Sequence, residues 1–243
     1  MRYIDLTKLL LKRANWGNSQ RLWTGSALKK DFSQASNDKC WYTEVSFAGQ
    51  DVHIDHFRPK AEIKQYQQYN YNAPLAARGY YWLSNDPENY RACCVYANRV
   101  THGGGKGNYF PLMQNSPLLT PGGNQQEIPM LLDPCDNADV NLISFMGNQV
   151  TCTSLNPTDQ LRVTVSTKLY NLDNSIINAQ RSRVWDDIAK TIQEYQSGDI
   201  TQAACLRKLN DSIDRKAPFS ACAIACINSL APNEIKSQLN LTL

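Results

Sequence analysis

Apolar residues recur at helical spacing near the beginning of the chain. Residues 5–31 alternate apolar and charged groups at this spacing, and the stretch contains Trp16 and Trp23. A helix that buries one face and exposes the other has this pattern. We therefore expect an N-terminal helical segment over residues 1–35.

The same periodicity returns beyond Ser166. In residues 174–198 the isoleucines and valine recur at helical spacing, and the run ends at a glycine, which is a common residue after a helix C-terminus. Thr201 is a suitable N-cap for a following helix. The apolar run 217–231 predicts a buried helix, so region 151–243 should be mainly helical.

Between these helical parts the pattern indicates short strands and turns. The runs 40–47 and 51–57 predict a hairpin with a glycine-containing turn. Residues 142–154 predict a second hairpin, because Gly-Asn stands at its centre. We expect a short helix in residues 91–100 and an irregular stretch over 64–79. Together these elements define an α+β protein.

Composition places the chain among ordinary globular proteins. Its 243 residues suffice for one large domain or two modest ones. No apolar run approaches the roughly 18 residues of a membrane span, and the first residues are too charged for a signal peptide. The eight cysteines are scattered, so we expect them to be mostly reduced and buried. A cytoplasmic protein without a membrane association is expected.

The charge is distributed unevenly. The net charge is +3, but the window 56–110 holds seven basic and three acidic residues. A mildly basic region of this kind is compatible with a phosphate-rich substrate. A solvated surface would have the same composition, so the charge alone does not decide between them.

The segment VHIDHFRPK, residues 52–60, carries the first candidate chemistry. Asp55 and His56 are neighbours on a β-branched run. Adjacent side chains on a strand point to opposite faces, so both can reach one site only where the strand ends. Pro59, with Arg58 forced to be extended before it, supports such an end. A hydrogen-bonded polar pair at a strand end is the alternative interpretation.

Two asparagines follow the Asp-His pair at a defined spacing. Asn89 lies in the turn of YYWLSNDPENY, and Asn98 lies nine residues further on. Together with KCWYTE, HIDHFRPK, GGKGNYFPL, IPMLLDPC and LISF, this order resembles the HNH nucleases of the ββα-metal fold. The similarity is to the Septu-type and retron-associated HNH proteins of bacterial anti-phage systems, and it runs from about Lys39 to Phe145.

The resemblance implies a role for each of the matching residues. His56 would be the general base that activates water, and Asp55 and Asn98 would bind Mg²⁺ or Mn²⁺. Asn89 would brace the loop that holds His56 in place, through hydrogen bonds to the backbone. Lys106, in the glycine-rich stretch, would contact the phosphate. Chemically, histidine suits the base because it is largely neutral at pH 7, and Mg²⁺ needs few protein ligands.

The sequence departs from this family at a structural zinc site. Members of the family have two C-x-x-C pairs, whose spacing suits zinc. Here the corresponding four positions are Cys40, Thr43, Cys94 and Ala97. Two thiolates cannot close a tetrahedral site, so structural zinc is not expected. Replacement of the missing ligands by Cys93 or His102 is the less favoured alternative.

Other residues have two interpretations each. His53 lies on the same face of the strand as Asp55, so it is either a neighbour of the metal site or an exposed histidine, and the exposed histidine is favoured. Trp41, Tyr80, Tyr81 and Trp82 are either a platform for stacked bases or core residues, and core packing is favoured.

These observations lead to one main hypothesis and one alternative. The first is a metal-dependent HNH endonuclease acting on DNA or RNA, the effector of an anti-phage system with an ABC-type ATPase partner, with or without a retron RNA–DNA. It would comprise the N-terminal segment 1–35, a nuclease core over 36–150 and the helical region 151–243. The alternative is a non-catalytic nucleic-acid-binding or scaffolding subunit that retains the fold. The presence of all the expected site residues favours the enzyme.

Overall fold

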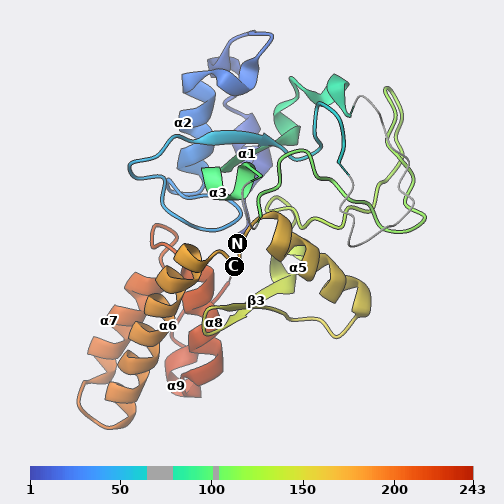
Figure 1. Ribbon diagram of the computed structural model, residues 1–243. Coiled ribbons are helices and arrows are strands. Elements are labelled where there is room, and N and C mark those ends of the chain that lie inside the picture. The colour runs from blue at the N-terminus through green and yellow to red at the C-terminus, as the bar shows by residue number, and fades with distance from the viewer. Residues whose placement is uncertain (65–78, 101–103, 243) are drawn as a thin grey trace.

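The computed structural model describes residues 1–64, 79–100 and 104–242, and it is an α+β structure (Figure 1). The expected irregular stretch 64–79 falls almost wholly outside these residues, as does His102. Within the described ranges, no helix has both the length and the apolar character needed to cross a membrane.

The N-terminal segment is helical but interrupted. Helix α1, Leu6–Leu10, is followed by two short 3₁₀ turns, and α2 spans Ser26–Ala35. Leu28 and Phe32 bury the inner face of α2, and the Phe32 ring stacks on Trp41 with centroids 5.3 Å apart. The predicted helical segment is therefore confirmed, as several short helices that pack on the central part of the chain.

The central element consists of two antiparallel strands and a short helix. Strand β1, His53–His56, pairs with β2, Tyr90–Cys93, so that Asp55 lies opposite Arg91 and His56 opposite Tyr90. Helix α3, Val95–Asn98, follows β2 directly. All four residues of β2 are buried, because α2 and the segment before β1 cover it.

The predicted hairpin over 40–47 and 51–57 is wrong. Residues 40–47 form a tight loop with a single bridge between Lys39 and Ser46, and Glu44 has a φ of 62° that interrupts an extended run. The partner of β1 is β2, which sequence reasoning assigned to the start of a helix. The amide of Trp41 donates to the carbonyl of Ala92 (2.9 Å), so the loop packs beside β2 instead.

The second predicted hairpin is confirmed. Helix α4, Asn137–Leu142, leads into β3, Ile143–Met146, which pairs with β4, Gln149–Cys152. Gly147 at the turn has a φ of 61°, a conformation that glycine adopts without steric cost. The boundary expected after residue 150 falls inside β4.

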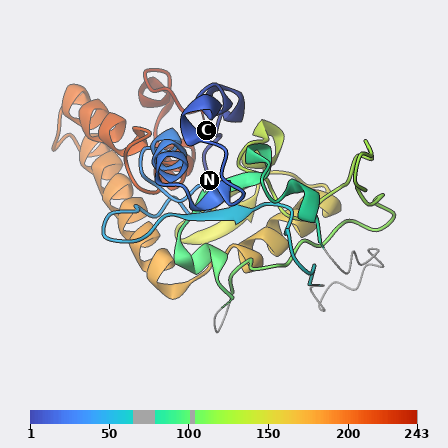
Figure 2. The ribbon, with the colours of Figure 1, turned by 90° about the horizontal axis from the view of Figure 1, so that it is seen from above.

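The C-terminal region is helical, as predicted, and its helices beyond residue 174 gather toward one end of the molecule in Figures 1 and 2. Asparagine and threonine side chains cap the starts of its three longest helices. Gly198, with a φ of 83°, follows the end of the 22-residue helix. The helices are α5 Pro157–Leu169, α6 Ser175–Gln196, α7 Gln202–Ile213, α8 Ser220–Leu230 and α9 Asn233–Lys236.

Two hydrophobic clusters hold these elements together. The larger one joins the N-terminal helices, the β1–β2–α3 element, α5 and parts of α6 and α8. The smaller one lies among α6, α7, α8 and α9, and Val184 and Trp185 of α6 contact both clusters. The region 151–243 is thus continuous with the rest of the core at α5 and has a cluster of its own beyond it.

Candidate functional site

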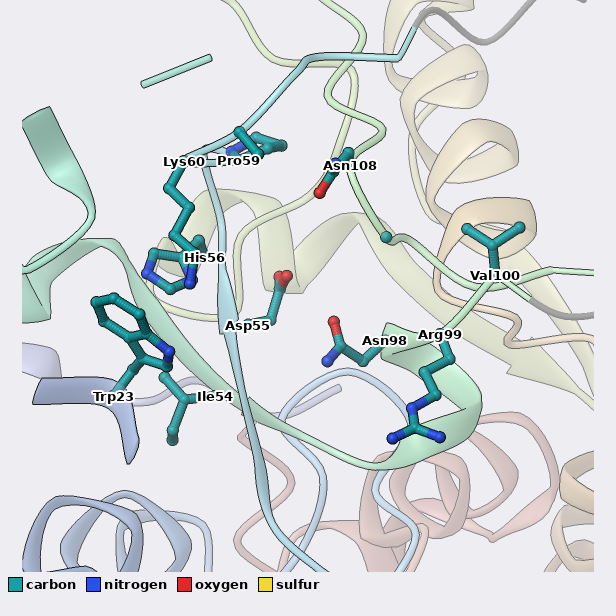
Figure 3. Close-up of a pocket in the computed structure, with 12 residues that line it drawn as sticks. Trp23, Ile54, Asp55, His56, Pro59, Lys60, Asn98, Arg99, Val100 and Asn108 are labelled. Carbon is teal, nitrogen blue, oxygen red and sulfur yellow. The ribbon is translucent and has the colours of Figure 1, made fainter. Parts of the chain in front are cut away.

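A cleft of about 480 Å³ opens where β1 ends, beside α3. Asp55 and His56 both line it, and β1 ends at His56, so the predicted strand end is confirmed. Figure 3 shows the Asp55 carboxylate between the His56 ring and the Asn98 amide. The rest of the wall is formed by Trp23, Ile54, Pro59, Lys60, Ala61, Arg99, Val100, Gly107 and Asn108.

The His56 ring is fixed in one orientation. Its Nε2 lies 2.9 Å from the carbonyl oxygen of Ser84. A carbonyl can only accept, so Nε2 carries the proton, and Nδ1 of the neutral ring is a proton acceptor. The edge contacts with Trp23 and Tyr90 hold the ring from two sides, with centroids 5.0 and 5.1 Å away. Burial lowers the pKa of His56 to about 4, so the ring is neutral at pH 7.

The Asn89 side chain bonds the backbone just after His56. Its Oδ1 accepts from the amide of Arg58 at 2.8 Å, and its Nδ2 donates to the carbonyl of Arg58 at 2.9 Å. The amide of Phe57 donates to the Asn89 carbonyl at 2.8 Å. The chain leaving β1 is therefore held at consecutive residues, in the geometry that the resemblance implies for Asn89.

Asp55 is buried and already has two hydrogen-bond donors. The hydroxyl of Tyr42 donates to Oδ2 at 2.7 Å, and the ammonium of Lys106 lies 3.0 Å from Oδ1. Asp55 is 4% exposed. Burial raises the pKa of its carboxyl, and the Lys106 charge and the Tyr42 hydrogen bond oppose that rise.

Lys106 does not face solvent. Its side chain is 0% exposed, and its ammonium also donates to the backbone carbonyl of His56 at 2.8 Å. The resemblance implies a phosphate contact for this residue. The structure instead directs the ammonium at Asp55 and the backbone of β1, on the inner side of the cleft.

Asn98 is oriented by His53. Its Nδ2 donates to Nδ1 of His53 at 3.1 Å, which turns the amide oxygen toward the Asp55 side of the cleft (Figure 3). The favoured interpretation of His53 as an exposed histidine is wrong, because the side chain is partly buried and bonds Asn98 beside the cleft. Asp55 and Asn98 thus present a carboxylate and an amide oxygen to one cleft, a donor set suited to Mg²⁺ or Mn²⁺.

Three further residues shape the site, and sequence reasoning assigned a role in it to none of them. Trp23 reaches the cleft from a 3₁₀ turn of the N-terminal segment, and the Lys60 ammonium lies 3.6 Å from its ring centroid. Tyr42 reaches Asp55 from the loop before β1. Tyr42 stands inside the KCWYTE motif, and that position was the one available indication. Nothing local in the sequence ties Trp23 to His56.

The motif LLDPC has a structural role beside the site. Nε of Arg91 lies 2.7 Å from Oδ1 of Asp133, and the two groups form a bidentate pair. Burial alone would raise the pKa of Asp133, but the Arg91 charge and hydrogen bonds lower it overall. Since Arg91 lies opposite Asp55 on β2, this pair keeps the guanidinium fixed next to the candidate metal ligand.

The positions that correspond to the zinc ligands of the family do come together. The Thr43 hydroxyl lies 3.7 Å from Sγ of Cys94, and the Thr43 amide donates to Sγ of Cys40 at 3.5 Å. Ala97, on α3, is buried. In the part of the chain that the structure describes, no three His, Cys, Asp or Glu side chains are grouped as a metal site.

The aromatic residues divide between core and surface. Trp41 and Tyr80 are fully buried, and the Tyr80 hydroxyl donates to Glu127 at 2.6 Å. Tyr81 is half exposed. Core packing is therefore the right interpretation for Trp41 and Tyr80, while Tyr81 lies at the surface.

No protein-family model matches this chain, and no curated protein does so either.

Proposed function

We propose that this chain is a metal-dependent HNH endonuclease that hydrolyses phosphodiester bonds of nucleic acid, with β1, β2 and α3 as a ββα-metal core. The observation that supports it best is the content of one cleft: a neutral histidine with an unprotonated Nδ1, and the oxygens of Asp55 and Asn98. These groups come from the ends of β1 and α3, where the resemblance implies them.

The residues divide the chemistry between them. His56 accepts a proton from water at Nδ1, and the water oxygen forms its bond to phosphorus as the bond to the leaving oxygen breaks. The leaving oxygen takes a proton from solvent. Asp55 and Asn98 would hold Mg²⁺ or Mn²⁺, and the ion would supply positive charge that stabilises the charge developing on the phosphate. Asn89 bonds the backbone of Arg58 and so keeps His56 in position.

The walls of the cleft suit a polyanion. Lys60 and Arg99 stand at its margin, and Arg99 is exposed. Cations at a cleft margin attract phosphates and orient the backbone without reading the sequence of bases. This arrangement supports nucleic acid as the substrate and leaves DNA and RNA as equal candidates.

The biological setting is proposed on the resemblance alone. We propose that the chain is the cytoplasmic effector of an anti-phage system and works with an ABC-type ATPase, with or without a retron RNA–DNA. The helices α6, α7 and α8 are our candidate for the docking region. Their shared cluster lies apart from the cleft, so a partner bound there would leave the cleft accessible.

A non-catalytic subunit is the second candidate, and one observation favours it. Both oxygens of Asp55 already accept hydrogen bonds, one of them from a buried ammonium. A chain that had lost metal binding could retain such a pair as a structural feature. His56 argues for the enzyme, because its Nε2 bonds the Ser84 carbonyl while its side chain lines the cleft beside Asp55 and Asn98, with Nδ1 left as an acceptor.

The test is a cleavage assay with the full chain, alone and with the ATPase partner. The substrates are duplex DNA, single-stranded DNA, single-stranded RNA and tRNA, each with Mg²⁺ or Mn²⁺ and with EDTA. The proposal expects metal-dependent cleavage of at least one substrate. Binding without cleavage under every condition would favour the non-catalytic subunit instead.

A further inference from the structure

The candidate metal ligand Asp55 forms a buried ion pair with Lys106. The Lys106 ammonium lies 3.0 Å from Oδ1 of Asp55 and donates to the His56 carbonyl at 2.8 Å. Lys106 is 0% exposed and Asp55 4%. An ion pair so far from solvent is screened little, so its two charges act strongly on any third charge brought beside them.

The position of Lys106 is built into the backbone. The Lys106 amide donates to the carbonyl of Ala97, and the Gly107 amide to the carbonyl of Asn98, each at 2.8 Å. Gly105 has a φ of 109°, and a Cβ there would lie 1.8 Å from the carbonyl oxygen of Arg99. Glycine is therefore required at this position, and it lets the chain turn back against α3 with Lys106 pointing inward.

Tyr42 fixes the other side of the carboxylate. Its hydroxyl donates to Oδ2 of Asp55 at 2.7 Å, and its ring stacks on Tyr170, with centroids 3.9 Å apart and an 11° interplanar angle. Tyr170 is in turn fixed by a hydrogen bond from its hydroxyl to the carbonyl of Leu132. The Asp55 carboxylate is thus oriented by the neutral hydroxyl of Tyr42, and its charge is balanced by the ammonium of Lys106.

We infer that Lys106 is a resident counter-cation of Asp55, which competes with the divalent metal for this carboxylate and weakens its binding. The inference rests on the proposed function, because it concerns the same metal site. A divalent ion bound at Asp55 is repelled by the fixed ammonium of Lys106, and the two cations share the single negative charge of Asp55. The phosphate of a bound nucleic acid adds the missing negative charge. Metal binding is therefore weak in the free protein and strengthened by the substrate.

The competition is measured by titrating the metal-free full chain with Mn²⁺ by calorimetry, without nucleic acid. Lys106→Met removes the ammonium and is expected to bind Mn²⁺ at least about tenfold more tightly than the wild type. Tyr42→Phe is the matched control, because it removes a donor to the same carboxylate but no charge, and it should not tighten binding. Asp55→Asn should abolish binding in either background.

A second variant and a second readout protect the test against misfolding. Lys106→Gln is neutral but can still donate hydrogen bonds, and the same tightening is expected. Both variants should melt below the wild type without metal, and Mn²⁺ should raise their melting temperatures more than that of the wild type. If neither variant folds in millimolar Mn²⁺, the inference is wrong, because the added cation should replace the lost charge.

The other contrary outcomes separate this inference from the proposed function. The inference that Lys106 competes with the metal is wrong if both Lys106 variants bind Mn²⁺ no more tightly than the wild type. It is also wrong if none of the proteins binds Mn²⁺. If the wild type shows metal-dependent cleavage that His56→Ala loses, the proposed nuclease function remains supported even when the competition is disproved. Binding that persists in Asp55→Asn would instead show that the metal site itself is misplaced.

Discussion

The side chain of Asn89 bonds both backbone polar groups of Arg58, at 2.8 Å to the amide and 2.9 Å to the carbonyl. Arg58 follows His56 by two residues, so this asparagine determines the path of the chain immediately after the candidate base. Asn89 is 4% exposed, which protects these hydrogen bonds from water. These bonds support the proposal that Asn89 positions His56.

We predict that Asn89→Ala lowers both stability and cleavage. The substitution leaves two buried backbone groups without partners, which costs about 1–3 kcal/mol for each such group. Cleavage should fall further than the loss of folded protein explains, since His56 is no longer held in place. Chemical denaturation and the cleavage rate of the remaining folded protein measure the two effects. A loss of stability with an unchanged rate would contradict the positioning role.

The parts of the fold that could be predicted have local causes. The glycine at the turn of residues 142–154, Gly198 after α6 and the cap Thr201 act within a few residues of themselves, and these elements were confirmed. Strand β2 was missed because Tyr90–Cys93 does not alternate polar and apolar residues. All four of its positions are buried, and its pairing depends on a partner far away in the chain.

The candidate site could likewise be predicted only in part. Asp55, His56 and Asn98 were candidates because the order of their motifs resembles that of HNH nucleases, and the structure places all three in one cleft. The inward direction of Lys106 depends on the return of the glycine-rich stretch against α3, which no local pattern reports. The contact between Trp23 and His56 likewise exists only in the folded chain.

We predict that the ion pair of Arg91 and Asp133 gives the protein an acid-sensitive stability. The Asp133 carboxyl has a lower pKa in the folded protein than in the unfolded chain, where it is about 3.9. Its contribution is therefore complete above about pH 4 and is lost as the pH falls through the folded pKa. At neutral pH, Asp133→Asn should cost about 3 kcal/mol, because it leaves a buried guanidinium unpaired.

The measurement is the unfolding free energy of the wild type and Asp133→Asn between pH 7 and pH 2. The two curves should converge as the pH falls below about 4. Asp173→Asn is the matched control, since its ion pair with Lys168 is half exposed and such pairs contribute about 0–1 kcal/mol. A constant difference between the wild type and Asp133→Asn across this range would contradict the assignment.

We predict that two substitutions create a zinc site that we do not expect in the wild-type chain. Thr43 contacts Cys40 and Cys94, and Ala97 lies on α3, one turn after Cys94. The double variant Thr43→Cys/Ala97→Cys should therefore bind one Zn²⁺ through four thiolates. Elemental analysis and the metal dependence of the melting temperature would show it.

The single variants are the controls for this prediction. Thr43→Cys and Ala97→Cys each supply three thiolates and should bind zinc more weakly than the double variant. Stoichiometric zinc in the wild type would contradict the expectation that the chain has no structural zinc. A double variant that folds without binding zinc would show that these four positions do not converge.

The central claim is that His56 activates water in this cleft, and the rate of cleavage by His56→Ala tests it most directly. The measurement compares wild type and variant under single-turnover conditions, on a substrate that the wild type cleaves, at saturating Mn²⁺ and with equal folded fractions. Removing a general base lowers such rates by about 10² to 10⁴-fold, and a loss in this range is expected. A variant that cleaves as fast as the wild type would contradict the account.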